Sequence, residues 1–186
     1  MFDLVAVSVA VLWLGGGFYL GLGWLRFERL RQVSDRADIA MDPLPSVSII
    51  IAARDEADSI DETLNRLACV AYPNLEVVVV NDRSGDATAR LASKHIGQVP
   101  GLQVVDIQTL PEEWIGKTHA LHEGYKHCSG EWLCFIDADV ALEPDCLTRA
   151  LAVVRTRRLD HLCLFPALRT HGPLECAFVM TFAFYF

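Results

Sequence analysis

Short apolar runs alternate with helical segments along most of this chain, and this alternation limits the fold more than any other feature. The first run, residues 47–53, is nearly continuous in β-branched and other apolar side chains, which is typical of a strand buried on both faces. Strand, helix and strand in succession favour a parallel sheet with right-handed crossovers. We therefore expect an α/β fold with a mostly parallel sheet and flanking helices. The predicted strands are residues 47–53, 75–80, 102–107 and 132–136, with a further strand at 161–165; the predicted helices are 59–67, 87–96, 117–128 and 144–157.

The start of the first predicted helix carries a recognisable pattern. Ser59 and Glu62 form an S-x-x-E sequence, which predicts a capping box. Ile60, Leu64 and Leu67 then follow the spacing of an apolar helix face. We expect this face to pack on the sheet.

Polar side chains follow three of the predicted strands at the points where the strands end. In open parallel sheets, ligands bind beyond the carboxyl ends of the strands. A single loop carboxylate is often only a turn former, but three sets at one sheet edge are harder to explain in that way. The sets are Ala53-Arg54-Asp55-Glu56, Asn81-Asp82-Arg83-Ser84 and Asp137-Ala138-Asp139.

Asp137 and Asp139 suggest a site for a divalent cation. On an extended chain these two side chains point the same way, whereas that of Ala138 points to the opposite face. Neighbouring carboxylates are tolerable when a hard cation such as Mg²⁺ or Mn²⁺ lies beside them, and such ions are commonly shared with substrate phosphates. Lys117 opens a predicted helix, where a positive charge is unfavourable unless it reaches an anionic ligand; a solvated lysine is the alternative.

Other candidate motifs are weaker or absent. His119, His122 and Glu123 share one predicted helix and could form part of a metal site, but without a third ligand at suitable spacing we favour packing or surface histidines. Trp114 suits either a sugar platform or plain packing. The chain has no Gly-rich phosphate loop of the P-loop or dinucleotide type and no CxxC pair, which argues against those classes of enzyme and against zinc ribbons. A net charge of −8 argues against nucleic-acid binding.

The N-terminal region predicts a membrane anchor. Residues 4–25 contain no charged residue and would span about 33 Å as a helix, enough for a ~30 Å hydrocarbon core. A buried core helix and a cleaved signal peptide are the alternatives, but a polar face, a basic start and a clear cleavage site are all lacking. Arg26, Arg29 and Arg31 follow at once, which predicts a single-pass anchor in the cell membrane with the following domain in the cytoplasm. Residues 26–45 are then a juxtamembrane linker.

Four segments together resemble family 2 glycosyltransferases of the GT-A fold, which is Rossmann-like. They occur between residues 46 and 165 in the family's order: SIIIAARDEADSI, VVVVNDRSGDAT, PEEWIGKTHAL and EWLCFIDADVAL. The PEEWIGK segment and the predicted anchor look most like membrane glycosyltransferases with lipid acceptors, such as the hopanoid-associated, glycosyl-carotenoid and ceramide types. On this basis residues 46–170 form the donor-binding domain.

The resemblance implies a nucleotide-diphosphate-sugar donor, most often UDP-linked, a lipid acceptor, inversion at the anomeric carbon and help from Mg²⁺ or Mn²⁺. Glu56 matches the acidic residue of the first loop, Asp82 the aspartate that holds the base or ribose, and Lys117 a basic residue that faces the diphosphate. We expect Ala53, Arg54, Glu56, Asp82, Lys117 and Asp137 to bind the donor, and Asp137 and Asp139 to bind the cation, with Asp139 the more direct ligand.

The C-terminal part departs from the family's pattern. The downstream general base and the Q-x-x-R-W-type segment are missing, and residues 171–186 read as the start of an interrupted apolar interfacial or membrane segment. We therefore expect a C-terminally truncated chain with no assigned catalytic base. One alternative is a catalytically incomplete nucleotide-sugar-binding remnant. A second is a haloacid-dehalogenase-type phosphohydrolase, in which Asp137 would be the nucleophile.

Overall fold

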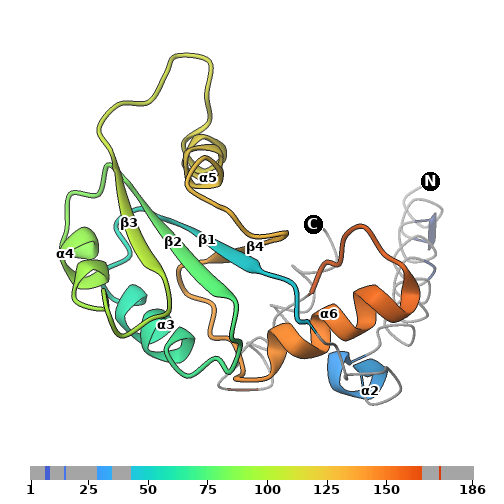
Figure 1. The fold of residues 1–186 in the computed structure, drawn as a ribbon. Helices are drawn as coiled ribbons and strands as arrows, with labels where there is room; N and C mark the ends of the chain where they lie inside the picture. The colour runs from blue at the N-terminus through green and yellow to red at the C-terminus, as the bar shows by residue number, and fades with distance from the viewer. Residues whose placement is uncertain (1–6, 9–14, 16–28, 35–42, 165–171, 173–186) are drawn as a thin grey trace. The chain divides into compact units, whose positions relative to one another are not determined.

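Four parallel strands form one sheet in the order β3-β2-β1-β4 in the computed structural model of this chain (Figure 1). The structure describes residues 7–8, 15, 29–34, 43–164 and 172. The chain divides into one unit of residues 1–35 and 163–186 and a second unit of residues 36–162. The first unit contributes the short helix α2 (Leu30–Ser34), and the second contains the sheet.

The strands lie where the apolar runs predict them. β1 (Val47–Ala53) and β3 (Leu102–Ile107) match the predicted ranges at both ends. β2 (Leu75–Asp82) and β4 (Trp132–Asp137) continue slightly further, so that Asp82 and Asp137 are the last residues of their strands. The sheet edge that carries the polar side chains is therefore built from regular strand backbone.

Helices cover both faces of the sheet and bury its central strands. Figure 1 shows α3 (Ile60–Leu67) and α4 (Thr88–Ser93) on one side of the sheet and α5 (Gly116–Tyr125) on the other. On the first side, the predicted stripe of α3 is fully buried against alternate residues of β1 and β2, and α6 (Cys146–Arg157) adds Leu147 and Leu151 to the same core. On the second side, Ala120 of α5 packs with Val78 and Val80. Burial on both faces confirms the interpretation of residues 47–53 as a central strand.

The order of the strands creates a switch point between β1 and β4. The chain moves outward from β1 to β2 and β3 and then returns through α5 to the other side of β1. Ala52 of β1 pairs in register with Asp137 of β4, while Ala53 pairs with Asn81 of β2. In doubly wound sheets, connections that diverge in this way leave a crevice at the carboxyl ends of the two strands.

Two local predictions are wrong. Residues 161–164 are not a strand, because they run as irregular chain after α6. The capping box at Ser59 does not form either: the Ser59 hydroxyl donates to Glu56 Oε2 at 2.7 Å, and no side-chain cap bond is made at this helix start. Glu56 lies one turn earlier and captures the hydroxyl, whose residue already has helical backbone angles.

The helices are also shorter than predicted. α4 ends at Ser93 rather than at residue 96, and α5 ends at Tyr125 rather than at residue 128, in each case with a turn beyond it. α6 ends at Arg157 as predicted. None of these differences changes which elements flank the sheet.

The predicted membrane segments lie almost wholly outside the described residues. Of residues 4–25 the structure describes 7, 8 and 15, and of residues 171–186 it describes 172. Within the part of the chain that is described, none of the helices has the length and apolar character needed to cross a bilayer. The anchor, its orientation and the apolar C-terminal segment stay predictions.

Candidate functional site

A cavity of about 370 Å³ opens at the carboxyl edge of the sheet, at the switch point between β1 and β4. It draws residues from the ends of β1, β2 and β4 and from the first turn of α5. All seven residues predicted to bind the donor or the cation line it, whereas Asp55, Asn81, Arg83 and Ser84 of the strand-end sets do not. The lining consists of Ala52, Ala53, Arg54, Glu56, Asp82, Gly116, Lys117, Asp137, Ala138 and Asp139.

The charged side chains of the cavity are mixed in sign, with acidic groups in excess. Four carboxylates and two basic side chains line it. An anionic ligand would meet Arg54 and Lys117, whereas the carboxylates of Asp137 and Asp139 would repel it in the absence of a cation. The cavity is therefore suited to an anion that arrives with a positive ion.

Lys117 and Asp137 form an ion pair across the cavity. The Nζ of Lys117, in the first turn of α5, lies 2.6 Å from Oδ1 of Asp137 at the end of β4. Both side chains are more than half exposed, at 61% and 58%. Exposed pairs of this kind are weak, so either partner is able to exchange for a ligand.

Asp82 is the most buried carboxylate of the site, with only 3% of its surface exposed. Arg83 compensates its charge by donating from Nε to Oδ1 at 2.8 Å and from Nη2 to Oδ2 at 3.1 Å. Arg83 adopts a left-handed backbone conformation with φ of 57°, which is uncommon for a residue other than glycine. The hydrogen bond to Asp82 raises the pKa of Arg83.

Gly116 allows α5 to approach this pair. A Cβ atom at this position would lie 2.9 Å from Asp82 Oδ2 and 3.1 Å from Arg83 Nη2, closer than side-chain atoms normally pack. The start of α5 therefore closes over the Asp82–Arg83 pair because residue 116 has no side chain. The amide end of the helix points a partial positive charge toward the cavity.

Hydrogen bonds connect the two loops that carry Glu56 and Asp82. Four of them join residues 55–57, after β1, to residues 84–88, after β2. Asp86 holds three of the amide or hydroxyl donors at this junction, and these bonds lower its pKa, with the Thr88 hydroxyl as the largest cause. The inter-loop bonds are Asp55 N to Ser84 Oγ, Gly85 N to Asp55 Oδ1, Glu56 N to Thr88 Oγ1 and Ala57 N to Asp86 Oδ2.

The two predicted cation ligands flank a turn that α3 holds in place. Asp137 ends β4, and Asp139 lies in the turn that follows, so the backbone is not extended through both residues as the sequence suggested. Even so, both aspartates line the cavity while Ala138 is 97% buried and belongs to the core. The buried hydroxyl of Thr63 donates to the Ala138 carbonyl at 2.7 Å. This contact fixes the turn from beneath.

The donor set of the turn fits Mg²⁺ or Mn²⁺ shared with a ligand. Two carboxylates on a solvent-open turn are hard oxygen donors, and these ions typically use one or two carboxylates together with substrate phosphates. Among the residues that the structure describes, no group of three or more His, Cys, Asp or Glu side chains is arranged to hold a metal ion. The protein thus offers part of a coordination shell rather than a closed cage.

The two histidines of α5 lie in different surroundings. His119 is buried, with its Nε2 3.4 Å from Glu123 Oε1. Trp114 stacks on His122 with ring centroids 5.0 Å apart and meets the edge of His119 at 5.3 Å. These contacts favour packing for the buried His119, whereas His122 is a surface histidine that stacks on Trp114.

Three residues that shape the site were not among the predicted donor or cation ligands. Arg83 and Gly116 lie directly beside the predicted residues Asp82 and Lys117, so an arginine after the strand-end aspartate and a glycine before the helix-opening lysine were available signals. Thr63 gave no signal, because its partner Ala138 is 75 residues away in sequence.

Comparison with known proteins gives a consistent family. The profile described as "Glycosyl transferase family 2" matches residues 48–180. The poly-beta-1,6-N-acetyl-D-glucosamine synthase of Staphylococcus aureus strain MSSA476 is 30% identical over 139 residues, which are 75% of this chain and 32% of that protein. The Staphylococcus epidermidis enzyme of the same name is 26% identical over 140 residues, with the same two coverages. This chain therefore spans about a third of the length of the curated relatives that it matches.

Solved structures share the fold. The mannosyltransferase PcManGT from Pyrobaculum calidifontis, in complex with GDP-Man and Mn²⁺, superposes with a TM-score of 0.61 at 27% identity and covers 83% of this chain and 44% of that one. TarS from S. aureus, in complex with UDP-GlcNAc, gives a TM-score of 0.52 at 27% identity over 61% of this chain and 32% of that one.

Proposed function

The chain belongs to glycosyltransferase family 2, and from this premise we propose that its cavity binds a nucleotide-diphosphate sugar whose sugar is transferred to an acceptor hydroxyl. The observation that carries the proposal is the convergence of all seven predicted donor and cation residues on one cavity at the switch point of the sheet. The family match also favours this reaction over the haloacid-dehalogenase-type alternative.

Each part of the cavity has a proposed role. Asp82, held by Arg83, accepts hydrogen bonds from the base or ribose, and Glu56 on the neighbouring loop also contacts the nucleoside. Arg54 and Lys117 face the diphosphate, whose negative charge they compensate. These roles account for the charged lining of the cavity apart from Asp137 and Asp139.

The transfer breaks the bond between the anomeric carbon and the diphosphate oxygen while the acceptor oxygen bonds to the same carbon from the opposite face. A divalent cation at Asp137 and Asp139 would neutralise the charge that develops on the leaving diphosphate. Lys117 adds a positive charge on the same side. In this scheme the four carboxylates that line the cavity bind either the nucleotide sugar or the cation. The scheme therefore assigns no base that takes the proton of the acceptor hydroxyl.

UDP-linked donors are our first choice, and GDP-linked donors are the second. The sequence resemblance favours UDP, and the neighbours solved with UDP-GlcNAc and with GDP-Man show that the fold serves both nucleotides. Asp82 and Arg83, which we assign to the base or ribose, are the groups most able to distinguish uracil from guanine. The choice is open to direct measurement.

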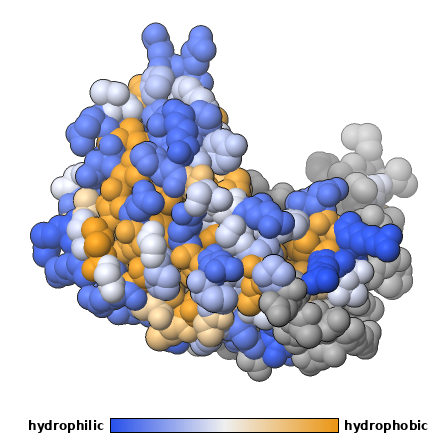
Figure 2. Space-filling model, in the orientation of Figure 1, coloured by the Kyte–Doolittle hydropathy of each residue, from blue (hydrophilic) through white to orange (hydrophobic). Residues whose placement is uncertain are grey.

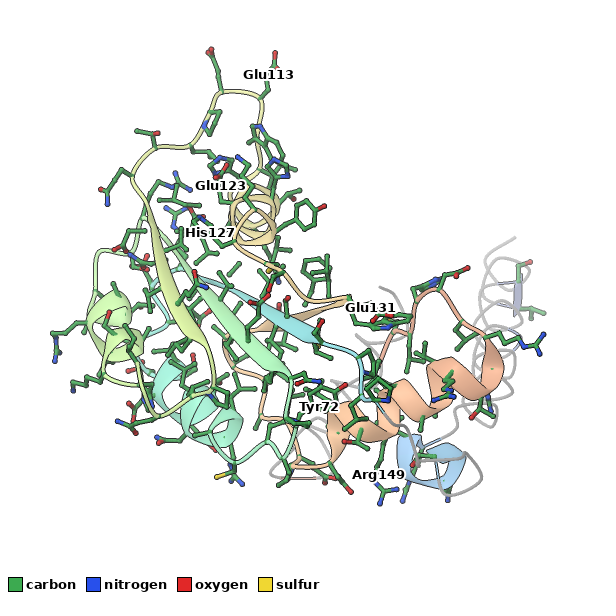
Figure 3. All side chains as sticks on the ribbon, in the orientation of Figure 1. Tyr72, Glu113, Glu123, His127, Glu131 and Arg149 are labelled. Atoms are coloured by element: carbon green, nitrogen blue, oxygen red, sulfur yellow. The ribbon has the colours of Figure 1, made fainter. Side chains whose placement is uncertain are left out.

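We further propose a lipid acceptor and a membrane-bound enzyme with a cytoplasmic site. The support is the charge-free run of residues 4–25 with the arginines after it, together with the apolar Ile115, 76% exposed directly beside the cavity residues Gly116 and Lys117. Figures 2 and 3 show a hydrophilic tip on the loop before α5, with Glu113 at its end, so only the base of this loop suits an apolar acceptor. A growing polysaccharide is the competing acceptor, because the curated relatives are named as synthases of one.

Calorimetry with a panel of UDP- and GDP-sugars in Mn²⁺ tests donor binding separately from transfer. We expect micromolar to millimolar binding of at least one donor, and a strong loss in Asp139→Asn because that change removes charge from a hard-cation ligand. Asp160→Asn is the matched control, since this exposed residue lies after α6, outside the cavity. Absence of binding by every donor contradicts the proposal.

Protease protection in membranes tests the cytoplasmic orientation, and transfer assays with lipid and polysaccharide acceptors decide between the two acceptor classes.

A further inference from the structure

The ion pair between Lys117 and Asp137 joins two side chains that the proposed function assigns to different ligands. Lys117 faces the donor diphosphate, and Asp137 faces the divalent cation. In the structure the two bind each other instead, with Nζ 2.6 Å from Oδ1. The Lys117 ammonium therefore lies where a cation would bind Asp137, and the Asp137 carboxylate lies where a diphosphate would bind Lys117.

This pairing affects a cation that arrives alone. An ammonium group so close to Asp137 Oδ1 uses one of the few carboxylate oxygens available, and its charge repels a divalent ion beside it. Asp139 is the only other carboxylate of the turn, and the described residues contain no larger group arranged for a metal. A cation without nucleotide should thus bind weakly.

A nucleoside diphosphate such as UDP or GDP removes both obstacles, the incomplete coordination shell and the repulsion by Lys117. Its oxygens complete the coordination shell of the cation, and they give Lys117 a new anionic partner. The pair is more than half exposed on both sides, so separating it costs little and needs no rearrangement of the core.

We propose that Lys117 is an exchangeable counter-ion: it neutralises Asp137 while the cavity is empty and moves to the donor diphosphate when the cation takes Asp137. This inference rests on the proposed function of the site. Its consequence is that the cation and the nucleotide bind cooperatively, each raising the affinity for the other by the same factor. The cooperativity depends on one side chain that can be replaced.

The test measures two affinities in the same variants: Mn²⁺ alone, and UDP or GDP in saturating Mn²⁺. Lys117→Met should bind Mn²⁺ alone about twofold to fivefold more tightly, as expected for loss of an exposed competing charge. The same variant should bind the nucleotide diphosphate more weakly. Opposite changes for the two ligands are the signature of exchange, because simple damage to the site would weaken both.

Two control variants define the result. Lys126→Met removes a lysine from the C-terminal end of the same helix, where Nζ pairs with Glu123 Oε1 at 2.7 Å, away from the cavity lining. It should leave both affinities unchanged. Lys117→Arg keeps the charge and should keep the weak binding of Mn²⁺ alone.

An Mn²⁺ affinity that is unchanged or lower in Lys117→Met overturns the exchange, whatever the nucleotide does. Failure of the wild-type chain to bind UDP or GDP in Mn²⁺ overturns the proposed function itself and removes the basis for the exchange. The two failures are distinguishable, because the first is read from Mn²⁺ alone and the second from the nucleotide.

Discussion

Arg83 holds the carboxylate of its sequence neighbour Asp82 at two points, through Nε to Oδ1 at 2.8 Å and Nη2 to Oδ2 at 3.1 Å. Because Asp82 is almost fully buried, this contact both compensates its charge and fixes its orientation at the end of β2. A planar guanidinium can form such a two-point contact, whereas a lysine ammonium cannot.

Arg83→Met should therefore weaken nucleotide binding roughly tenfold, as expected for the loss of charge-assisted hydrogen bonds that orient a ligand group. Arg83→Lys should give an intermediate affinity. Arg90→Met removes an arginine from the exposed surface of α4 and is the control. Calorimetric titration with UDP and GDP measures all three variants. Equal nucleotide affinity of Arg83→Met and the wild type would show that the contact between Arg83 and Asp82 has no part in binding.

Gly116→Ala tests the close approach of α5 to the Asp82–Arg83 pair. The new Cβ would lie 2.9 Å from Asp82 Oδ2, so the helix start or the pair must shift. Alanine favours helix over glycine by up to ~1 kcal/mol, which should offset part of the strain in the free energy of unfolding. We expect a folded protein with clearly reduced nucleotide affinity, measured by calorimetry beside thermal unfolding.

Gly85→Ala is the control for that variant, because its Cβ would lie at an ordinary 3.8 Å from Asp55 Oδ1. Nucleotide binding that is preserved in Gly116→Ala, or reduced equally in Gly85→Ala, argues against a specific role for the approach at residue 116.

The carboxylate of Glu76 is the centre of a hydrogen-bond cluster and does not line the cavity. Its oxygens accept hydrogen bonds from the Ser48 hydroxyl, the Ser129 amide and hydroxyl, and the Gly130 amide, and so join β1 and β2 to the turn before β4. Burial raises the pKa of Glu76, but the hydrogen bonds from Ser129, Ser48 and Gly130 outweigh it and hold the pKa below the ordinary 4.5.

A carboxyl group whose pKa is lower in the folded state stabilises the fold above its unfolded pKa and loses that effect as the pH falls through its folded pKa. Glu76→Gln should therefore lower the free energy of unfolding by about 1–3 kcal/mol near neutral pH, with a shrinking difference from the wild type below about pH 4. Urea unfolding over this pH range measures the difference. Glu113→Gln, at the exposed loop tip labelled in Figure 3, is the control and should leave the free energy of unfolding near neutral pH unchanged. If the difference in unfolding free energy between Glu76→Gln and the wild type stays the same at acid pH, the hydrogen bonds to the charged carboxylate are not its cause.

The sequence predicted the sheet better than the details around it, for a physical reason. A central parallel strand is buried on both faces, so β1 and β2 need continuous runs of apolar residues, and these runs are visible without any structure. The position of a polar residue directly after such a run also predicts the sheet edge on which it lies. This reasoning was enough to bring Glu56, Asp82 and Asp137 to one cavity.

Contacts between distant segments could not be predicted in the same way. The capping box at Ser59 fits the local pattern, yet Glu56 takes the hydroxyl because the loop after β1 is itself fixed by bonds to the loop after β2. A local pattern does not contain this competition. The orientation of each site residue likewise depends on partners that the fold brings together.

Thr63 provides the sharpest test of such a partner. Its hydroxyl is buried under the turn of Asp137 and Asp139 and donates to the Ala138 carbonyl at 2.7 Å. Thr63→Val has nearly the same shape but leaves this buried carbonyl without its donor, which should cost about 1–3 kcal/mol and free the turn to move. Thr63→Ser keeps the hydroxyl and removes a methyl group, at a cost of roughly 1 kcal/mol.

Both variants should lower the thermal unfolding temperature, but they should differ in binding. If the hydroxyl fixes the separation of the two carboxylates, Thr63→Val should reduce the gain in UDP or GDP affinity that Mn²⁺ provides, whereas Thr63→Ser should retain most of it. Titrations with and without Mn²⁺ give this gain for each variant. An equal loss in both would mean that packing beneath the turn matters rather than the hydrogen bond, since the hydroxyl is present in only one of them.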